Sequence, residues 1–251
     1  MKLLLDLGNS ALKWGLWAQG RGLLRVGRIG YDALPDSLGA LAKGEGVEPA
    51  PVSSAVAASV ISPAWERRVE QALKTGGIHD VEWLRSGRSA LGLESGYHEP
   101  TELGADRWAA LLGSLQRAPC GGIIVDIGTA VTVDGVDPQG RHLGGAIFPG
   151  AGLLGASLGS GTVRLSVDPE GEAPVLPGRS TQEGISAGIR YGLAGAIDRL
   201  ECELEAGRRA GPARILTGGG AAPLAPLLSG SWRLVPHLVL EGLGRWAEAH
   251  G

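Results

Sequence analysis

Two short stretches of the sequence place a carboxylate, a glycine and small polar side chains directly after an apolar run. The first reads DLGNS at residues 6–10, and the second reads DIGTA at residues 126–130. Glycine has no Cβ, so the backbone at such a turn can come close to a ligand. Carboxylate oxygens suit a hydrated cation. The residue types therefore suit a phosphate with its cation, although a plain hairpin with a solvated aspartate remains the alternative at each stretch.

The two stretches are copies of one pattern, which is an apolar run, Asp, an apolar residue, Gly and then a second apolar run. They start about half the chain apart. A duplicated strand–turn–strand unit predicts two like domains, one in each half, that face each other across a cleft. Lys13 follows the first turn and could reach a phosphate. It could equally be an outward-facing strand residue.

A third candidate site lies at Asp106 and Arg107 in a predicted helix over residues 102–116. The apolar stripe of this helix contains Leu103, Ala110 and Leu111, and the charged pair falls on or beside it. Charges on a buried face need partners. One interpretation is a structural ion pair. The other is a site in which Arg107 holds a carboxylate in fork geometry and Asp106 accepts a hydroxyl proton.

Composition excludes several classes of protein. The 251 residues are 43% hydrophobic with a net charge of −3, which argues against a general nucleic-acid or anionic-membrane surface. Cys120 and Cys202 have no CxxC partner and no His at ligand spacing, so we expect two free thiols and no zinc site. No uncharged apolar run approaches the ~20 residues of a membrane helix. We expect a cytoplasmic protein without nucleic-acid or membrane partners.

The first half predicts an α/β domain over residues 1–118. We expect strands at 3–7, 11–18, 22–29, 52–60 and 81–84, and helices at 32–43 and 63–75. The second helix has Ser62 as its N-cap and Pro63 at its first position. Residues 87–100 read as irregular, and Thr101 can cap the helix at 102–116.

The second half predicts a domain over residues 119–251. Its expected strands are at 122–134 (two strands around the second turn), 141–149, 214–217 and 232–235, and its expected helices at 151–160, 184–207, 221–228 and 239–249. Residues 168–177 are rich in Pro and read as an exposed loop. Gly184, Gly188 and Gly192 form a stripe on the long helix, beside its apolar stripe. Since each glycine costs about 1 kcal/mol relative to Ala, we expect another backbone to pack closely there.

Three further stretches accompany the two turns. Gly96-Tyr97 is followed by LGADRW at residues 103–108. The run HLGG at 142–145 precedes Pro149-Gly150, and LTGGG occupies residues 216–220. With these five motifs in order, the chain resembles the type III pantothenate kinases, a branch of the acetate kinase, sugar kinase, actin and heat-shock chaperone superfamily. The resemblance runs from Lys2 to about Val239. It implies two duplicated ribonuclease H-like domains facing across a nucleotide cleft.

The resemblance also implies roles for individual residues. ATP-binding positions would be Asp6, Leu7, Gly8, Asn9, Ser10, Ala11, Leu12, Lys13, Gly128, Thr129, Gly218 and Gly219. Substrate-binding positions would be Tyr97, Gly104, Ala105, Asp106, Arg107 and Thr181, with Asp106 as the catalytic base. Asp6 would hold Mg²⁺ through water, and Asp126 a monovalent cation, potassium or ammonium. Glu99 stands where the family usually has Asn, which adds a negative charge near an anionic substrate.

The function that the resemblance implies is ATP-dependent phosphorylation of pantothenate by a homodimer, the first step of coenzyme A synthesis. Two alternatives stay open. A non-catalytic nucleotide-binding regulator could share the fold, but it would not need a base such as Asp106. A sugar or acetate-type kinase of the superfamily is the other, and the short chain argues against it. No GxxxxGK[ST] motif occurs, which excludes a P-loop enzyme.

Overall fold

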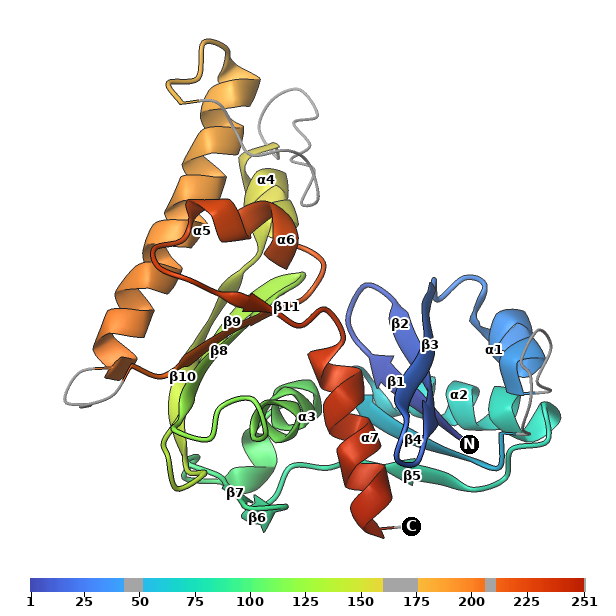
Figure 1. Cartoon of the computed structure of the whole chain (residues 1–251). Helices are drawn as coiled ribbons and strands as arrows, with labels where there is room; N and C mark the ends of the chain where they lie inside the picture. Colours follow the sequence, from blue (N-terminus) through green and yellow to red (C-terminus); the bar gives the residue numbers. More distant parts are fainter. Residues whose placement is uncertain (43–51, 160–175, 206–210, 251) are drawn as a thin grey trace. The chain divides into compact units, whose positions relative to one another are not determined.

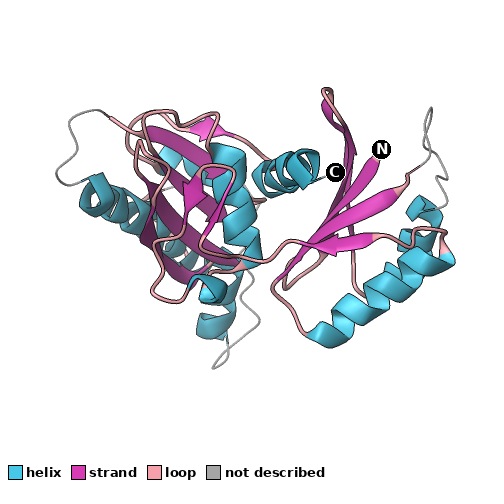
Figure 2. Cartoon of the chain, turned by 90° about the horizontal axis from the view of Figure 1, so that it is seen from below, coloured by secondary structure: helices cyan, strands magenta, loops and turns pink. Residues whose placement is uncertain are grey.

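The structure is a computed structural model that describes residues 1–42, 52–159, 176–205 and 211–250. The chain divides into two compact units. The first comprises Met1–Gly113 with Leu238–Gly251, and the second comprises Ser114–His237. Each unit contains a five-stranded sheet with helices packed on it (Figures 1 and 2).

The first sheet has the strand order β3-β2-β1-β4-β5. Its strands are β1 (Lys2–Leu7), β2 (Leu12–Ala18), β3 (Gly22–Ile29), β4 (Ser54–Ser59) and β5 (Val81–Trp83). The first three form an antiparallel meander, and β4 and β5 add in parallel to β1. Because β1 and β4 are parallel, their carboxyl ends lie next to each other at the same end of the sheet.

Alternation along β1 separates the two faces of this sheet. Leu3, Leu5 and Leu7 lie in one core cluster with residues of α1 (Leu34–Ala42) and α2 (Pro63–Thr75). α2 begins at Pro63 and ends before Gly77, whose φ of +95° suits glycine, as the sequence predicts. Asp6 has the opposite parity to these leucines and therefore belongs to the other face.

The other face is covered by α7 (Leu238–His250). A Cβ on Gly15 of β2 would meet Leu240 at 3.3 Å, and one on Gly244 would meet the Trp17 ring at 2.3 Å. A Cβ on Gly242 would lie 1.8 Å from the carbonyl oxygen of Ala109 in α3 (Ala105–Ser114). α7 thus packs backbone to backbone on α3, which fixes the helix that carries Asp106 and Arg107.

The second unit repeats the plan of the first. Its sheet has the order β10-β9-β8-β11-β12, in which β8–β10 form an antiparallel meander while β11 and β12 are parallel to β8. The strands are β8 (Gly122–Ile127), β9 (Ala130–Val136), β10 (His142–Pro149), β11 (Ala213–Thr217) and β12 (Arg233–Leu234). The helices are α4 (Ala151–Gly159), α5 (Thr181–Glu205) and α6 (Ala221–Leu224). The predicted duplication of an α/β unit is confirmed.

Most predicted elements are present, and four differ. Residues 87–100 contain a small hairpin of β6 (Ser89–Ala90) and β7 (Leu93–Glu94), turning at Leu91 with φ 51° and Gly92 with φ 86°. The prediction of an irregular segment was wrong there, because leucine is an unusual residue for such a turn. The helix expected over 221–228 is α6 followed by a 3₁₀ turn, Ala225–Leu227. Pro226 in that turn has no N–H with which to continue α-helical bonding.

The helix expected over 102–116 is also shifted. A 3₁₀ turn at Pro100–Glu102 comes first, and α3 begins only at Ala105. Leu103 between them is extended and buried, so its side chain reaches the core at the expense of continuous helix. Thr101 lies in the 3₁₀ turn and does not cap α3. Gly104 instead accepts the first hydrogen bond of the helix, from the N–H of Trp108 at 2.9 Å.

The last helix differs in its domain. The sequence predicts domains at 1–118 and 119–251, whereas α7 belongs to the first unit, which it joins through contacts such as Lys2 Nζ to the carbonyl of Ala247 at 2.9 Å.

The end of the helix predicted at 32–43 and most of the loop predicted at 168–177 lie outside the described residues. Cys120 and Cys202 are free and exposed, as expected. No helix in the described part of the chain is long and apolar enough to cross a membrane.

Candidate active site

The first unit carries an acidic residue and a lysine at the end of its central hairpin. Asp6 and Lys13 are direct partners in the β1–β2 register, and Lys13 Nζ lies 3.4 Å from Asp6 Oδ2. Asp6 is only 4% exposed. Burial raises the pKa of its carboxyl above the usual aspartate value, the Lys13 charge lowers it, and the Asp106 charge raises it again. Lys13 therefore stabilises the ionised form of a carboxylate that lies in a dry environment.

The turn after Asp6 presents exposed polar groups. Gly8 is half-buried, while Asn9 and Ser10 are exposed. A Cβ on Gly8 would make only an ordinary contact, 3.6 Å from the carbonyl oxygen of Ala11, and its φ is not positive. The fold itself does not require glycine here. Close approach of a ligand to the backbone explains the residue better.

Tyr31 holds this turn in place through a side-chain hydrogen bond. Its hydroxyl donates a hydrogen bond of 2.5 Å to the carbonyl of Gly8, and its ring packs against Trp65 with centroids 4.6 Å apart. Burial, and then the charge of Asp6, raise the pKa of Tyr31 to about 12. The phenol therefore stays protonated and keeps donating to the turn. Sequence reasoning missed Tyr31, because nothing local connects it with Gly8.

Asp106 lies in the first turn of α3. Its Oδ1 accepts a hydrogen bond of 2.7 Å from the N–H of Arg107. A Cβ on Gly104 would come within 2.7 Å of the same oxygen, so a larger residue at 104 would displace the carboxylate. Burial is the largest cause that raises the pKa of Asp106, and the Arg107 N–H, the Arg107 charge and the Lys13 charge oppose it. A carboxylate with a raised pKa is a stronger base than a solvated one.

Asp6, Lys13 and Asp106 share one electrostatic environment. Lys13 lowers the pKa of both carboxyls, and the charge of Asp106 raises that of Asp6. The first turn, at Asp6, and the start of α3, at Asp106, are therefore neighbours in the fold although they are about a hundred residues apart in the sequence. The structure thus combines a phosphate-type turn and a candidate base within the first unit.

Arg107 and Tyr97 form a second pair of predicted residues that the structure joins. Arg107 is 6% exposed, and its Nη1 donates a 2.5 Å hydrogen bond to the hydroxyl of half-buried Tyr97. The guanidinium carbon also lies 5.4 Å from the centre of the tyrosine ring. A buried guanidinium held by a phenol is suited to a carboxylate ligand. Glu99 nearby in the chain is exposed and makes no capping hydrogen bond with its side chain.

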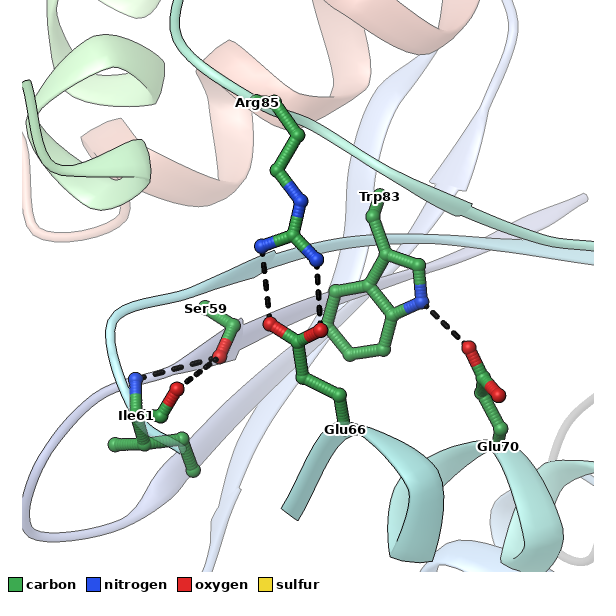
Figure 3. A network of polar contacts seen from close by, with 6 residues as sticks. All are labelled: Ser59, Ile61, Glu66, Glu70, Trp83 and Arg85. Atoms are coloured by element: carbon green, nitrogen blue, oxygen red, sulfur yellow. Dashed lines mark hydrogen bonds and ion pairs between the residues drawn. The ribbon is translucent and has the colours of Figure 1, made fainter. Parts of the chain in front are cut away.

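Polar contacts link α2 with the segments that follow β4 and β5 (Figure 3). Arg85 forms a two-fold hydrogen bond with Glu66 of α2, at 3.0 and 2.7 Å, and this bond is the largest cause that lowers the pKa of Glu66. Ser59 at the end of β4 accepts a hydrogen bond from the N–H of Ile61 at 3.3 Å. Val60, between Ser59 and Ile61, would touch a Cβ on Gly104 at 3.7 Å. The turn at residues 59–61 therefore lies against Gly104.

The second unit contains the other predicted turn, with its own supports. Asp126 is half-buried at the end of β8, and Gly128 and Thr129 are exposed. The N–H of Gly150 donates to the carbonyl of Thr129 at 2.9 Å, and a Cβ on Gly150 would lie 2.2 Å from the carbonyl oxygen of Gly128. A Cβ on Gly128 itself would find only ordinary contacts. As at Gly8, the fold itself therefore does not require glycine at position 128, whereas Gly150 is required by the close approach of the turn backbone.

Gly218 packs against the same turn from β11. Its φ is +90°, and a Cβ there would lie 2.4 Å from Asp126 Oδ1. The N–H of Gly220 donates to the carbonyl of Ile127 at 2.9 Å. The three glycines at 218–220 therefore form an ordered turn with Gly219 exposed. The structure brings Asp126, Gly128, Thr129 and Gly218 together.

Arg190 and Thr181 belong to α5 in this unit. Arg190 is 4% exposed and lines a small cavity with Ile127, Gly128 and Gly220, so a buried arginine lies beside residues of the second turn. Sequence reasoning missed it, because it reads as one charge on an otherwise amphipathic helix. Thr181 is the first residue of α5 and lies at an apolar groove instead of the Asp126 turn.

Metal ligands are few at both turns. Among the described residues, no cluster of three or more His, Cys, Asp or Glu side chains could hold a metal ion. Asp6 and Asp126 each supply one carboxylate to a turn with exposed backbone. That donor set fits a hydrated Mg²⁺ or a monovalent cation that takes further oxygens from water, backbone and phosphate, and it does not fit zinc.

Solved structures of similar fold support the architecture. A protein from Campylobacter jejuni titled a conserved putative Baf family transcriptional activator aligns over 98% of both chains, with a TM-score of 0.61 and 19% identity. A putative 2-dehydro-3-deoxygalactonokinase from Sinorhizobium meliloti covers 100% of this chain and 97% of its own, with a TM-score of 0.59 and 14% identity. MreB5 of Spiroplasma citri has a TM-score of 0.53 at 12% identity, over 99% of this chain and 96% of its own. At these identities the likeness concerns the fold alone, which is that of the actin and sugar-kinase ATPases.

Sequence relatives are much closer. A type III pantothenate kinase of Halorhodospira halophila is 46% identical over 250 residues, covering 99% of this chain and 98% of the relative. Another, of Alkalilimnicola ehrlichii, is 39% identical over 255 residues with the same coverage. The sequence profile of the type III pantothenate kinases matches residues 2–202. The chain belongs to the type III pantothenate kinase family.

Proposed function

We propose that the chain transfers the γ-phosphoryl group of ATP to the primary hydroxyl of pantothenate, giving ADP and 4′-phosphopantothenate for coenzyme A synthesis. Family membership supports the reaction. The observation that carries it within this molecule is the placement of Asp106 in the environment of Asp6 and Lys13, with Arg107 and Tyr97 hydrogen-bonded beside it. A regulator that only bound nucleotide would need neither a base nor a carboxylate anchor. ATP and pantothenate are both available in the cytoplasm, where we place the enzyme.

ATP would bind through its phosphates at the two turns. The residues at the first turn are Asp6, Leu7, Gly8, Asn9, Ser10, Ala11, Leu12 and Lys13, and those in the second unit are Gly128, Thr129, Gly218 and Gly219. Asp6 would hold Mg²⁺ through water, since Mg²⁺ keeps much of its hydration shell. Bound Mg²⁺ would neutralise charge on the phosphates. Phosphoryl transfer depends mainly on such positioning and charge compensation.

Pantothenate would bind at the other end of this environment. Its carboxylate suits the buried Arg107 guanidinium, which Tyr97 orients, and its primary hydroxyl suits Asp106. Gly104 and Ala105 are the other substrate contacts that we propose in this unit, and the absence of a Cβ at Gly104 leaves the Asp106 carboxylate in place beside them. Thr181 of the second unit is the remaining substrate contact that we propose.

Asp106 would act as the base. As the hydroxyl oxygen of pantothenate bonds to the γ-phosphorus, the bond from that phosphorus to the β,γ-bridging oxygen breaks, and the hydroxyl proton passes to Asp106. Lys13 stabilises the ionised form of Asp106 and so keeps it ready to accept the proton. Because the transition state of such transfers is loose, much of the contribution of Asp106 would be to orient the hydroxyl.

Asp126 would hold a monovalent cation, potassium or ammonium. Its carboxylate adds a negative charge at a turn that we propose binds phosphate, so a counter-charge is needed. Gly218 and Gly150 shape the backbone around it. A single carboxylate with backbone and water oxygens suits a large cation of low charge better than it suits a transition metal.

The enzyme would be a homodimer that pairs through α5. Gly184, Gly188 and Gly192 line an apolar groove of about 690 Å³ with Ile185 of the same helix, Leu158 of α4 and Phe148 of β10. Apart from the adjacent residues and backbone of α5 itself, no described atom lies within 4 Å of a Cβ built on any of the three glycines, and Leu158 is 53% exposed. The glycine stripe thus meets no backbone within the described part of this chain. A second copy of α5 would provide the close packing that the stripe predicts.

The cation proposal predicts activation that depends on the ion. Pantothenate phosphorylation should be faster in potassium or ammonium than in sodium at equal ionic strength, and Asp126→Asn should remove most of the difference. The measurement is turnover in the three buffers with saturating Mg-ATP. Equal rates for the wild type in sodium and potassium would contradict the proposal.

The dimer proposal predicts a matched pair of outcomes. Gly188→Leu should give monomers, because the side chain fills the groove. Gly87→Leu makes the same change in the first unit, away from α5, where a Cβ also meets nothing within 4 Å, and it should stay dimeric. Sedimentation at micromolar concentration measures both. A monomeric wild type at that concentration would show the proposal to be wrong.

The role of Asp106 predicts opposite effects on turnover and stability. Asp106→Asn should lower kcat by at least about 10²-fold, the usual cost of losing a general base. Since the folded-state pKa is raised, the ionised carboxylate disfavours folding at pH values above the usual 3.8, and that cost grows until the pH passes the folded-state value. The neutral Asn should therefore unfold at the same or a higher temperature than the wild type.

Arg107→Lys is the comparison variant, and it should mainly raise the KM for pantothenate because it loses the fork. In the wild type, kcat/KM should fall with decreasing pH through a pKa above 3.8. Steady-state kinetics and thermal unfolding decide the matter. Near-normal turnover together with a lower unfolding temperature in Asp106→Asn would identify Asp106 as a structural ion-pair partner instead.

A further inference from the structure

Arg28 continues a row of charged side chains across the first sheet. The register pairs Asp6 of β1 with Lys13 of β2, and Lys13 with Arg28 of β3. Directly opposed residues of antiparallel strands point to the same face. Asp6, Lys13 and Arg28 therefore project from one face, in a row that spans about 10 Å at a strand separation of about 5 Å.

The row lies at the same end of the sheet as the first turn. Leu7, Leu12 and Ile29 form the next row, on the opposite face, and all three are buried in the core cluster. That core row fixes the orientation of the charged one, because adjacent residues on a strand alternate in direction. Arg28 thus shares a face with the Asp6–Lys13 pair.

Arg28 also differs from Lys13 in its surroundings. Lys13 forms an ion pair with Asp6, which offsets much of its charge. Arg28 is exposed, and no hydrogen bond or ion pair connects its side chain with the residues that the structure describes. At one end of the row lies the carboxylate proposed to hold Mg²⁺, and at the other a guanidinium that nothing in the described chain neutralises.

We infer that Arg28 binds the terminal phosphates of the nucleotide, beside Lys13. The inference rests on the proposed function, which places a triphosphate at the Asp6 turn. Lys13 lowers the pKa of both Asp6, the proposed Mg²⁺ ligand, and Asp106, the proposed base. The phosphoryl group that passes between these two residues would therefore lie next to Lys13. Arg28 is the next cation along the row. Guanidinium groups bind phosphate oxygens in a two-fold geometry, which suits a long arginine on an edge strand.

A different role for Arg28 is protection of the sheet edge. β3 is an edge strand, and charged residues on such strands prevent pairing with other chains. Edge protection would be independent of nucleotide, whereas phosphate binding depends on the number of phosphates in the ligand. This difference provides the test.

The test is calorimetric binding of a non-hydrolysable Mg-ATP analogue and of AMP, without pantothenate, to the wild type and three variants. Arg28→Gln should weaken binding of the triphosphate analogue by about tenfold or more, since it removes a charge-assisted hydrogen bond to phosphate, and should change AMP binding much less. Arg28→Lys should recover part of the loss. Arg21→Gln removes an arginine from the turn between β2 and β3, at the opposite end of β3 from Arg28. This variant should bind both ligands as the wild type does.

Each outcome supports or overturns the inference. Unchanged binding of the analogue by Arg28→Gln would assign Arg28 to edge protection. An equal loss of affinity for the analogue and for AMP would show that Arg28 maintains the structure of the site and does not bind the terminal phosphates. Either result overturns the inference. Arg28→Gln should also unfold at the wild-type temperature. If the wild type binds the analogue but makes no phosphopantothenate, the proposed function fails while the inference about Arg28 stands; a wild type that binds no nucleotide overturns both.

Discussion

The first unit depends on electrostatic compensation of two carboxylates, Asp6 and Asp106. Burial raises the pKa of both, and the charge of Asp106 raises that of Asp6 further. Without compensation, two such groups would take up protons. The charge of Lys13 lowers the pKa of Asp6, and the N–H and charge of Arg107, followed by the charge of Lys13, lower the pKa of Asp106. The position of Lys13 is set by backbone pairing, because it is the direct partner of Asp6 in the hairpin.

The rest of the unit keeps these three groups in place. The β1–β2 hairpin holds Asp6 and Lys13, and Tyr31 fixes the turn between them through the Gly8 carbonyl. α3 is fixed by the backbone contact with α7 at Gly242, and Gly104, just before α3, packs against Val60. Glycine has two distinct uses in this arrangement. At 104 and 242 it makes room for other atoms of the chain, and at 8 it leaves backbone open to a ligand. The second unit repeats the use at 128, on a sheet of the same strand order.

Sequence reasoning recovered what is encoded locally. The duplicated turns, the meanders that carry them, α2 and α5 follow from hydrophobic pattern, capping residues and turn residues, and the family motifs identified the candidate site residues. It failed where tertiary contacts decide. The late start of α3 depends on burial of Leu103, the β6–β7 hairpin turns at a leucine, and α7 completes the first unit although it follows the second in sequence. Tyr31 and Arg190 carry no local signal, because Tyr31 reaches the first turn through a tertiary hydrogen bond to Gly8, and Arg190 lines a cavity with residues that are distant in sequence.

Phosphoryl transfer from ATP to pantothenate is tested most directly by phosphorus NMR of the purified protein with Mg-ATP, potassium and pantothenate, followed over time. We expect a phosphomonoester signal of 4′-phosphopantothenate to grow in step with ADP, and ATP to be stable when pantothenate is left out. ATP turnover that yields only inorganic phosphate, or nucleotide binding without any new phosphomonoester, would show that the protein does not carry out this transfer.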